Sequence, residues 1–284
     1  MKERAREARA DGRIVGLVPT MGALHAGHIA LLERARTECA PVYASIFVNP
    51  KQFGPNEDFT KYPREFDADL AKLATAGVDA VFAPEPSEMY PPGFVTHVSV
   101  DGISERLEGR TRPGHFRGVT TVVMKLLQIV QPHRAYFGRK DAQQARIVQQ
   151  MGRDMSLDSE IVVCPIVREA DGLALSSRNA YLDARERKAA TVLHRALEAA
   201  KRELAQGERD TLQLQTTMHR VLDHEPLCRV DYVEIVNAET FESVVRVNRS
   251  CYVLLAAYFG KTRLIDNLYV ESVPGGSDEL LLHL

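Results

Sequence analysis

Residues 14–167 alternate short apolar runs with segments of helical spacing, and this alternation restricts the possible folds more than any other feature. The apolar runs that read as strands are residues 14–18, 42–48, 78–83, 134–137 and 161–167. The stretches with helical spacing between them are residues 29–35, 66–76, 119–130 and 141–151. Because each helix returns the chain to start the next strand in the same direction, the pattern predicts an α/β domain with right-handed crossovers. We expect a Rossmann-like parallel sheet with helices on both faces.

The pattern of predicted helices and strands changes beyond about residue 181. A long charged helix is predicted over residues 183–206 and a second over 211–222, followed by strands at 230–236, 250–259 and 263–269. These strands have little helix between them, which is typical of an α+β domain. We place the boundary between Val167 and Leu175, giving one domain of residues 1–170 and a smaller α+β C-terminal domain of residues 171–284. The N-terminal ten residues predict a solvated helix, and the tail 275–284 gives no prediction.

The charge balance excludes several classes of protein. The 284 residues carry 36 basic and 38 acidic side chains, a formal net charge of −2, so a general nucleic-acid binder is not expected. A nucleotide in a local basic pocket remains compatible with this balance. The longest apolar run, residues 252–259, is far shorter than the ~20 residues that span a bilayer. The four cysteines form no CxxC pair, so neither a disulfide framework nor a zinc site is predicted. We expect a cytoplasmic protein.

The first segment whose residues could take part in binding or catalysis is PTMGALHAGH, residues 19–28, between the first strand and its helix. A glycine-rich turn that opens a helix can present backbone N–H groups and the helix dipole to an anion. It is not a P-loop, because His28 and Ile29 stand where lysine and a hydroxyl residue are required, and no GxGxxG occurs. His25 and His28 lack a third metal ligand. Two histidines flanking Gly27 favour donation to phosphate oxygens over a purely structural role.

Two further segments suggest a bound small molecule. In residues 45–58, Asn49 and Gln52 follow the second strand and suit a hydroxylated anionic ligand, although solvated turn amides are an equal reading. Residues 109–119 carry three arginines and a histidine in a stretch rich in Gly and Pro. We expect a gating loop near an anionic substrate there.

The last two segments also follow strands. In FGRKDAQQ, Lys140 can reach a polyphosphate, and Asp141 can bind Mg²⁺, bind a ribose hydroxyl or cap the helix. Either Gln143 or Gln144 can face a substrate. In READGLALSSRN, residues 168–179, the run Ser176 to Arg178 can clamp phosphates from the second domain.

In order and spacing, PTMGALHAGH, SIFVNPKQF, RPGHFRGV, FGRKDAQQ, READGLALSSRN and TRLIDN resemble the pantothenate synthetase (pantoate–β-alanine ligase) family. This family belongs to the HxGH nucleotidylyltransferase superfamily, and the resemblance covers residues 14–269. It implies that (R)-pantoate and ATP form pantoyl adenylate and pyrophosphate, after which β-alanine displaces AMP to give pantothenate. It also implies Mg²⁺ with the ATP, a homodimer, no nucleic-acid or membrane partner, and a C-terminal domain that acts as a lid over the catalytic domain.

The resemblance assigns roles residue by residue. Gln52 and Gln144 would bind pantoate, with Gln52 also bordering β-alanine. The implied catalytic residues are His25, His28, Lys140, Ser176 and Arg178, with the proton-donor role on His28. The implied ATP-binding residues are Met21, Gly22, Ala23, Leu24, His25, Ala26, Gly27, His28, Gly138, Arg139, Lys140, Asp141, Val167, Leu175, Ser176, Ser177 and Arg178. No protein ligand to a metal is assigned.

The sequence departs from the family pattern at Arg139 and Ala142, which flank the Lys140–Asp141 pair and bear on local packing. The alternative function is another HxGH-type nucleotidylyltransferase acting on a small molecule. A class I aminoacyl-tRNA synthetase shares the HxGH motif, but this chain has no basic appended domain. A regulatory nucleotide-binding protein would bind ATP without releasing AMP.

Overall fold

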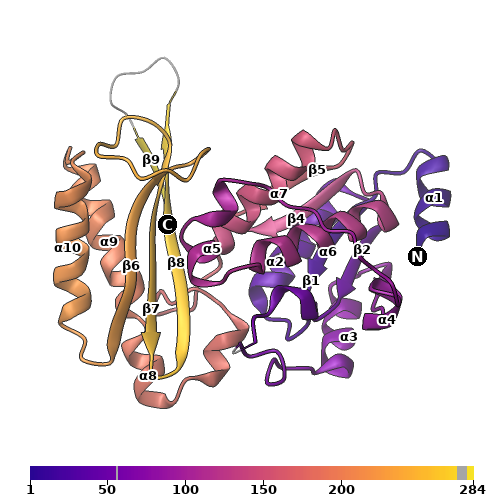
Figure 1. Cartoon of the computed structure of the whole chain (residues 1–284), viewed down its shortest axis with the longest axis horizontal. Coiled ribbons are helices and arrows are strands. Elements are labelled where there is room, and N and C mark those ends of the chain that lie inside the picture. The colour runs from indigo at the N-terminus through magenta and orange to yellow at the C-terminus, as the bar shows by residue number, and fades with distance from the viewer. Residues whose placement is uncertain (56, 274–279) are drawn as a thin grey trace. The chain divides into compact units, whose positions relative to one another are not determined.

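The computed structural model describes residues 1–55, 57–273 and 280–284, and the chain divides into two compact units, Met1–Cys164 and Pro165–Leu284 (Figure 1). This division falls just before the stretch 167–175 in which the sequence placed the boundary. The last strand of the first unit ends at Cys164, earlier than its apolar run. Pro165 follows, and proline has no N–H group with which to continue a sheet ladder.

Among the described residues, the first unit forms a five-stranded, wholly parallel sheet in the order β3-β2-β1-β4-β5. Its strands are β1 (Gly16–Thr20), β2 (Val42–Ile46), β3 (Ala80–Phe82), β4 (Arg134–Gly138) and β5 (Glu160–Cys164). Its α-helices are α1 (Lys2–Ala10), α2 (Ala26–Glu38), α3 (Phe66–Thr75), α4 (Pro86–Met89), α5 (Glu108–Thr111), α6 (His115–Val130) and α7 (Ala142–Asp154). Short 3-10 helices are η1 (Pro50–Gln52), η2 (Ile103–Glu105) and η3 (Arg139–Asp141). The predicted parallel α/β fold is confirmed.

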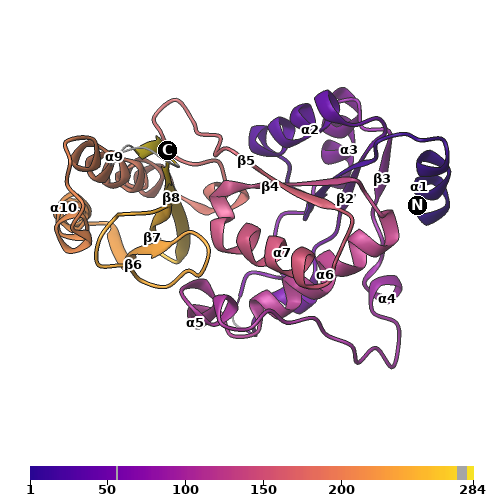
Figure 2. The same cartoon turned by 90° about the horizontal axis from the view of Figure 1, so that it is seen from above.

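Helices cover both faces of this sheet, as Figure 2 shows from above. Side chains alternate along a strand, so Val18 and Leu17 of β1 point to opposite faces. Val18 packs in one core with α2 and α3, through Leu32 and Leu73. Leu17 packs in a second core with residues of α6 and α7. Ala5 and Ala8 of α1 are buried in the second core, so the N-terminal helix is not the solvated helix that we expected.

The order of the strands creates a switch point between β1 and β4. From β1 the strands β2 and β3 follow one another toward one edge of the sheet. The next strand along the chain, β4, lies on the other side of β1. At such a point the loops after two neighbouring strands lead away to opposite faces and leave a crevice at their carboxyl ends. The loops after β1 and β4 are the segments 21–25 and 139–141.

The second unit is an antiparallel α+β structure, as predicted. Its described strands follow the order β6-β7-β8-β9, with β6 (Cys228–Asn237), β7 (Cys251–Phe259), β8 (Thr262–Ser272) and β9 (Leu280–His283). Its helices are η4 (Ser177–Tyr181), α8 (Ala184–Ala189), α9 (Val192–Ala205) and α10 (Thr211–Asp223). Leu197 of α9 and Leu214 of α10 pack with Val253 and Leu268 in one core.

Two further features of the structure correct the sequence-based expectations. The long helix predicted over 183–206 is interrupted, because the hydroxyl of Thr191 donates to the carbonyl oxygen of Lys188 at 2.8 Å and such a bond bends a helix. Residues 109–119 are largely helical rather than a loop. The sequence led to no expectation for residues 275–284, and the structure places strand β9 there. Residues 274–279 lie outside the described residues.

No helix in the described part of the chain has the length and apolar character needed to span a bilayer.

Candidate active site

The turn after β1 is fixed by a carboxylate from α3. Ala23 and Leu24 donate their backbone N–H groups to the two oxygens of Asp69, each at 2.8 Å, and the Asp69 residue is only 1% exposed. Gly22 has a φ of 81°, and a Cβ there would lie 2.9 Å from the Asp69 carboxylate. Glycine therefore meets both the backbone conformation and the lack of space at this position.

The expected backbone cradle for phosphate is largely absent from this turn. Besides the two N–H groups bound by Asp69, Gly22 donates to the Thr20 hydroxyl at 3.2 Å. Gly27 donates its N–H to His25 at 3.2 Å, and His25 donates its own to His28 at 3.3 Å. These N–H groups already have partners, so side chains must supply most of the contacts to an anion here.

The two histidines are held in one tautomer. Their rings lie with centroids 4.1 Å apart, and in each ring Nδ1 accepts a backbone N–H group. A nitrogen that accepts carries no proton, so each neutral ring carries its proton on Nε2. Burial, followed by the charge of Lys140, lowers the pKa of His25 to about 4. Burial, followed by the charge of His25, lowers the pKa of His28 to about 3. Both rings are therefore neutral donors at physiological pH.

Lys140 and Asp141 lie close to the histidines. They sit in η3 directly after β4, and the charge of each acts on both rings, Lys140 lowering and Asp141 raising the histidine pKa values. Lys140 Nζ lies 3.8 Å from an Asp141 oxygen. Asp141 occupies the N-cap position of α7 but makes no side-chain capping bond, and its side chain is half exposed. The structure thus brings together the 21–28 and 138–141 segments at the switch point.

Gln52 lies against the same turn. Its amide nitrogen donates to the sulfur of Met21 at 3.0 Å, and its amide oxygen accepts from Asn49 at 3.1 Å. Asn49 also donates to the carbonyl oxygen of Gly118 and accepts from the Tyr90 hydroxyl at 2.8 Å. Gln52 is 8% exposed and Asn49 is 1% exposed, so the alternative of solvated turn amides is wrong.

The 109–119 segment supports Gln52 rather than forming an open cationic loop. Arg112 makes a two-pronged ion pair with Glu57, at 2.7 and 2.6 Å. His115 is buried at the start of α6 and contacts the carbonyl oxygen of Gln52 at 2.8 Å. Arg110 and Arg117 are exposed.

The structure separates the two glutamines that the sequence left as alternatives. Gln143 is buried, donates to the carbonyl oxygens of Ile103 and Arg106 at 2.8 Å each, and accepts from the N–H of Glu108 at 3.1 Å. Its amide is fully used inside the unit. Gln144 is half-buried and therefore stays the candidate for substrate binding.

In the second unit, the serine-rich loop has a fixed conformation. The Ser176 hydroxyl accepts the N–H of Arg178 at 3.2 Å and caps η4, which also contains Ser177. The carbonyl oxygen of Val167 accepts the N–H of Leu175 at 3.0 Å. At the base of the loop, Arg168 forms a bidentate pair with Asp266, at 2.6 and 3.0 Å, and the Asp266 side chain is 1% exposed. This pair gives the TRLIDN segment of β8 a structural role.

Sequence reasoning did not single out Asp69 and Asp266. An aspartate on the apolar face of a predicted helix is the signal that could have identified Asp69, because a buried carboxylate needs donors. Asp266 lies in the TRLIDN segment, which indicates the family, but its pairing with Arg168 is visible only in the structure. Both carboxylates hold a loop that carries predicted site residues.

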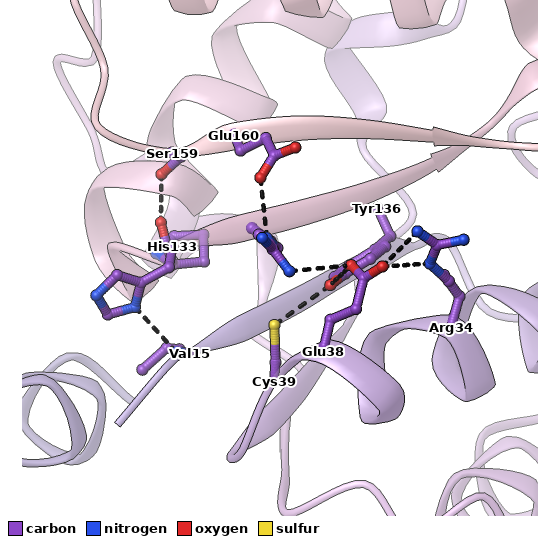
Figure 3. Close-up of polar contacts among 10 residues, drawn as sticks. Val15, Arg34, Glu38, Cys39, His133, Tyr136, Ser159 and Glu160 are labelled. Carbon is purple, nitrogen blue, oxygen red and sulfur yellow. Dashed lines mark hydrogen bonds and ion pairs between the residues drawn. The ribbon is translucent and has the colours of Figure 1, made fainter. Parts of the chain in front are cut away.

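A polar network fixes the far end of α2, as Figure 3 shows. The buried Tyr136 of β4 donates its hydroxyl to Glu38 at 2.9 Å and accepts from the thiol of Cys39 at 3.2 Å. Burial, followed by these two hydrogen bonds, raises the pKa of Tyr136. Arg34 and Arg134 pair with the same Glu38 carboxylate. Because the N-terminal turn of α2 carries the histidines, these contacts limit how far the helix can move relative to β4.

The described residues contain no group of three or more His, Cys, Asp and Glu side chains arranged to hold a metal ion. Mg²⁺ is usually bound by one or two carboxylates together with substrate phosphates. Asp141 is the carboxylate near the histidines and Lys140, so the donor set fits an ion that is held mainly by a bound phosphate.

A parallel sheet with imidazoles and a lysine gathered at its switch point is typical of α/β proteins that bind a ligand at the carboxyl ends of their strands. The family model described as pantoate-beta-alanine ligase matches residues 1–269. A pantothenate synthetase of Koribacter versatilis is 52% identical over 272 residues, 96% of this chain and 94% of the relative. One from Chloroflexus aurantiacus is 55% identical over 267 residues, 94% of this chain and 95% of the relative. The chain belongs to the pantoate–β-alanine ligase family.

Solved structures agree with this assignment. The crystal structure of pantothenate synthetase from Thermus thermophilus matches with a TM-score of 0.89 and 49% identity, covering 93% of this chain and 96% of that chain. The pantoate–β-alanine ligase of Francisella tularensis, complexed with beta-gamma ATP and beta-alanine, has a TM-score of 0.75 and 34% identity. It covers 98% of this chain and 97% of that one. The predicted family and fold are confirmed.

Proposed function

We propose that this enzyme uses ATP to condense (R)-pantoate with β-alanine, giving pantothenate, AMP and pyrophosphate through pantoyl adenylate. The observation that carries the proposal is the arrangement at the switch point. Two Nε2–H donors on His25 and His28 lie beside Lys140, and the Gln52 amide is held against Met21 of the same turn. This combines donors for a polyphosphate with a polar group for a hydroxylated acid.

In the first step, a carboxylate oxygen of pantoate attacks the α-phosphorus of ATP. The new P–O bond forms as the bond to the β-phosphate bridging oxygen breaks, and pyrophosphate leaves with that electron pair. The pantoate carboxylate is already ionised, so no base is required. Neutral Nε2–H groups of His25 and His28 and the ammonium of Lys140 would stabilise the charge that develops on the phosphates. Correct orientation of two bound reactants can contribute about 7–11 kcal/mol.

In the second step, the amine of β-alanine attacks the acyl carbon of the adenylate. A C–N bond forms, the C–O bond to AMP breaks, and the amine releases a proton. We assign pantoate binding to Gln52 and Gln144, and β-alanine to the surroundings of Gln52. The remaining assignments follow the family resemblance: ATP binding by residues 21–28, 138–141, Val167 and Leu175 to Arg178, with Ser176 and Arg178 on the phosphates.

The same resemblance supports three further features. Mg²⁺ would accompany ATP and neutralise charge on its phosphates. The enzyme would be a homodimer in the cytoplasm, without nucleic-acid or membrane partners. The C-terminal domain expected from the sequence, residues 171–284, would act as a lid over the domain of residues 1–170.

Pantoate-dependent exchange of labelled pyrophosphate into ATP tests the first step. We expect exchange only with both ATP and pantoate, and pantothenate only after β-alanine is added. Exchange that proceeds equally without pantoate, or with another small acid in its place, would favour a different HxGH-type nucleotidylyltransferase. ATP binding with no AMP release would favour a regulatory protein.

A further inference from the structure

A chain of polar groups, buried at His115 and half-buried at Arg112 and Glu57, contacts the backbone of Gln52. His115 Nδ1 lies 2.8 Å from the carbonyl oxygen of Gln52, and its Nε2 lies 3.0 Å from a guanidinium nitrogen of Arg112. The same guanidinium forms the two-pronged ion pair with Glu57. His115 is 9% exposed, so its ring is shielded from solvent, while the side chains of Arg112 and Glu57 are half-buried.

The partners of His115 define its protonation. A carbonyl oxygen only accepts, so Nδ1 must donate to Gln52, while a guanidinium only donates, so Nε2 must accept from Arg112. One ring satisfies both contacts only as the neutral Nδ1–H tautomer. Burial, followed by the charge of Arg112, lowers the pKa of His115 to about 4, in keeping with a neutral ring. This tautomer is the opposite of the one held by His25 and His28.

The contact matters because Gln52 ends the short helix η1. The last carbonyl groups of a helix lack partners within it, and here the carbonyl oxygen of Gln52 accepts from His115 at 2.8 Å and, over a longer 3.4 Å, from Arg112. Gly118, one turn further along α6, approaches η1 so closely that a Cβ would lie 2.1 Å from the carbonyl oxygen of Lys51. The backbone of Gln52 is therefore held from α6, while its amide reaches Met21 and Asn49.

We propose that His115, oriented by the Arg112–Glu57 pair, is a positioning residue for Gln52 and through it for the hydroxy acid substrate. The inference rests on the proposed function, since Gln52 is assigned to pantoate there. Both ring nitrogens of His115 are engaged by protein groups, so it would act through Gln52 and not by binding substrate itself. Its loss should weaken pantoate binding selectively, because the ATP-facing turn is held separately by Asp69.

The first test compares three variants by steady-state kinetics. His115→Phe keeps a ring but removes both hydrogen bonds, and we expect KM for pantoate to rise about tenfold with KM for ATP nearly unchanged. His115→Asn restores an N–H donor toward Gln52 and should recover most of the pantoate affinity. His97→Phe makes the same substitution at an exposed histidine and should behave like the unaltered enzyme. An unchanged KM for pantoate in His115→Phe, or an equal loss for ATP and pantoate, overturns the positioning role.

The second test uses the unaltered enzyme, so it does not depend on whether a variant folds. Nitrogen NMR of the labelled histidine ring at pH 7 should show His115 protonated on Nδ1 alone. A ring protonated on Nε2, or on both nitrogens, contradicts the inference. If the unaltered enzyme instead lacks pantoate-dependent exchange, the proposed function fails, and the NMR result still tests the tautomer separately.

Discussion

Hydrogen bonds to single ring atoms determine what the histidines of the first unit can do. His25 and His28 accept backbone N–H groups on Nδ1, whereas His115 donates from Nδ1 to a carbonyl oxygen. All three have pKa values lowered by burial, so they act as neutral groups near pH 7. The first two carry their proton on Nε2, and the third uses both ring nitrogens in contacts within the protein. The proposed roles, phosphate contact for His25 and His28 and positioning for His115, therefore depend on opposite tautomers of the same residue type.

Replacing His28 with Ala should remove one donor from the developing phosphate charge. Loss of a single preorganised donor costs roughly 10²–10³ in kcat, so we expect pantoate-dependent pyrophosphate exchange to fall by about that factor. Far-UV circular dichroism should stay unchanged. His97→Ala, at an exposed position, is the control. Exchange within about twofold of the unaltered enzyme would remove His28 from the catalytic set.

Gln143 and Gln144 offer a matched pair for alanine substitution. Gln144→Ala should raise KM for pantoate about tenfold and leave KM for ATP and stability unchanged. Gln143→Ala removes the amide donor to the carbonyl oxygens of Ile103 and Arg106 and the acceptor of the Glu108 N–H, which should lower the free energy of unfolding by about 1–3 kcal/mol. Kinetics and urea unfolding of both variants separate the two roles. An equal loss of ATP and pantoate affinity in Gln144→Ala would mark that residue as structural.

At the scale of elements, helices anchor the loops that carry the candidate site. Helix α3 supplies Asp69 to the turn after β1, and α6 supplies His115 and the close approach of Gly118 to η1. Helix α2 is held at its far end by the Tyr136–Glu38 network. Each anchor comes from an element distant in sequence, which makes the site sensitive to changes away from the reacting atoms.

Asp69→Asn should loosen the turn after β1. An amide retains one acceptor oxygen but presents an NH₂ group to the second backbone N–H, leaving a buried donor unsatisfied at a cost of about 1–3 kcal/mol. We expect a lower free energy of unfolding in urea and about tenfold slower pyrophosphate exchange. Asp67→Asn on the exposed face of the same helix should change neither. Full activity in Asp69→Asn would show that the turn does not depend on the carboxylate.

Gly118→Ala tests the contact between α6 and η1. The new Cβ would meet the backbone oxygen of Lys51, and overpacking of this kind costs about 1–3 kcal/mol. Pantoate affinity should fall with stability, since Gln52 follows Lys51. Gly152→Ala in α7 is the control, because its Cβ would lie 3.7 Å from Ile161 and the change should stabilise the helix by about 0.5–1 kcal/mol. Equal thermal stability of the two variants would argue against a tight contact.

For the whole molecule, buried neutral histidines make the first unit sensitive to mild acid. In the unfolded chain, His25, His28 and His115 would bind protons near pH 6.5, but in the folded unit only near pH 3 to 4. The unfolded state therefore binds more protons in that interval, and the free energy of unfolding falls as pH is lowered from about 6.5. Carboxylates such as Glu57, whose pKa is lowered, respond at lower pH.

Thermal unfolding followed by circular dichroism should show Tm decreasing between pH 7.5 and 5. In His115→Asn the decrease should be smaller than in the unaltered enzyme, because one of the three buried histidines is gone. A Tm that is the same at both pH values would contradict the neutral, buried state of these rings.

The alternation of apolar runs and helical spacing sufficed to predict the order and type of most elements, because side-chain periods of two and 3.6 are local properties. It did not predict the break at Thr191, helix α5, the start of α6 at residues 115–118 or the strand β9. At Thr191 a local side-chain bond interrupts the helical pattern. Glycine and proline near residues 113–118 favour a loop prediction from the sequence, whereas in the structure the start of α6 packs closely against η1.

By itself, the sequence determined the parallel α/β fold of the first unit, the α+β character of the second and the family, because periodicity and ordered motifs are readable along the chain. Tertiary structure decided which polar residues remain for substrate. Asp69 accepts the backbone N–H groups that were expected to bind phosphate, Glu57 pairs with Arg112, and Gln143 is hydrogen-bonded within the unit while Gln144 is half-buried. These outcomes depend on hydrogen bonds between residues about 35 to 55 positions apart, and only folding brings such partners together.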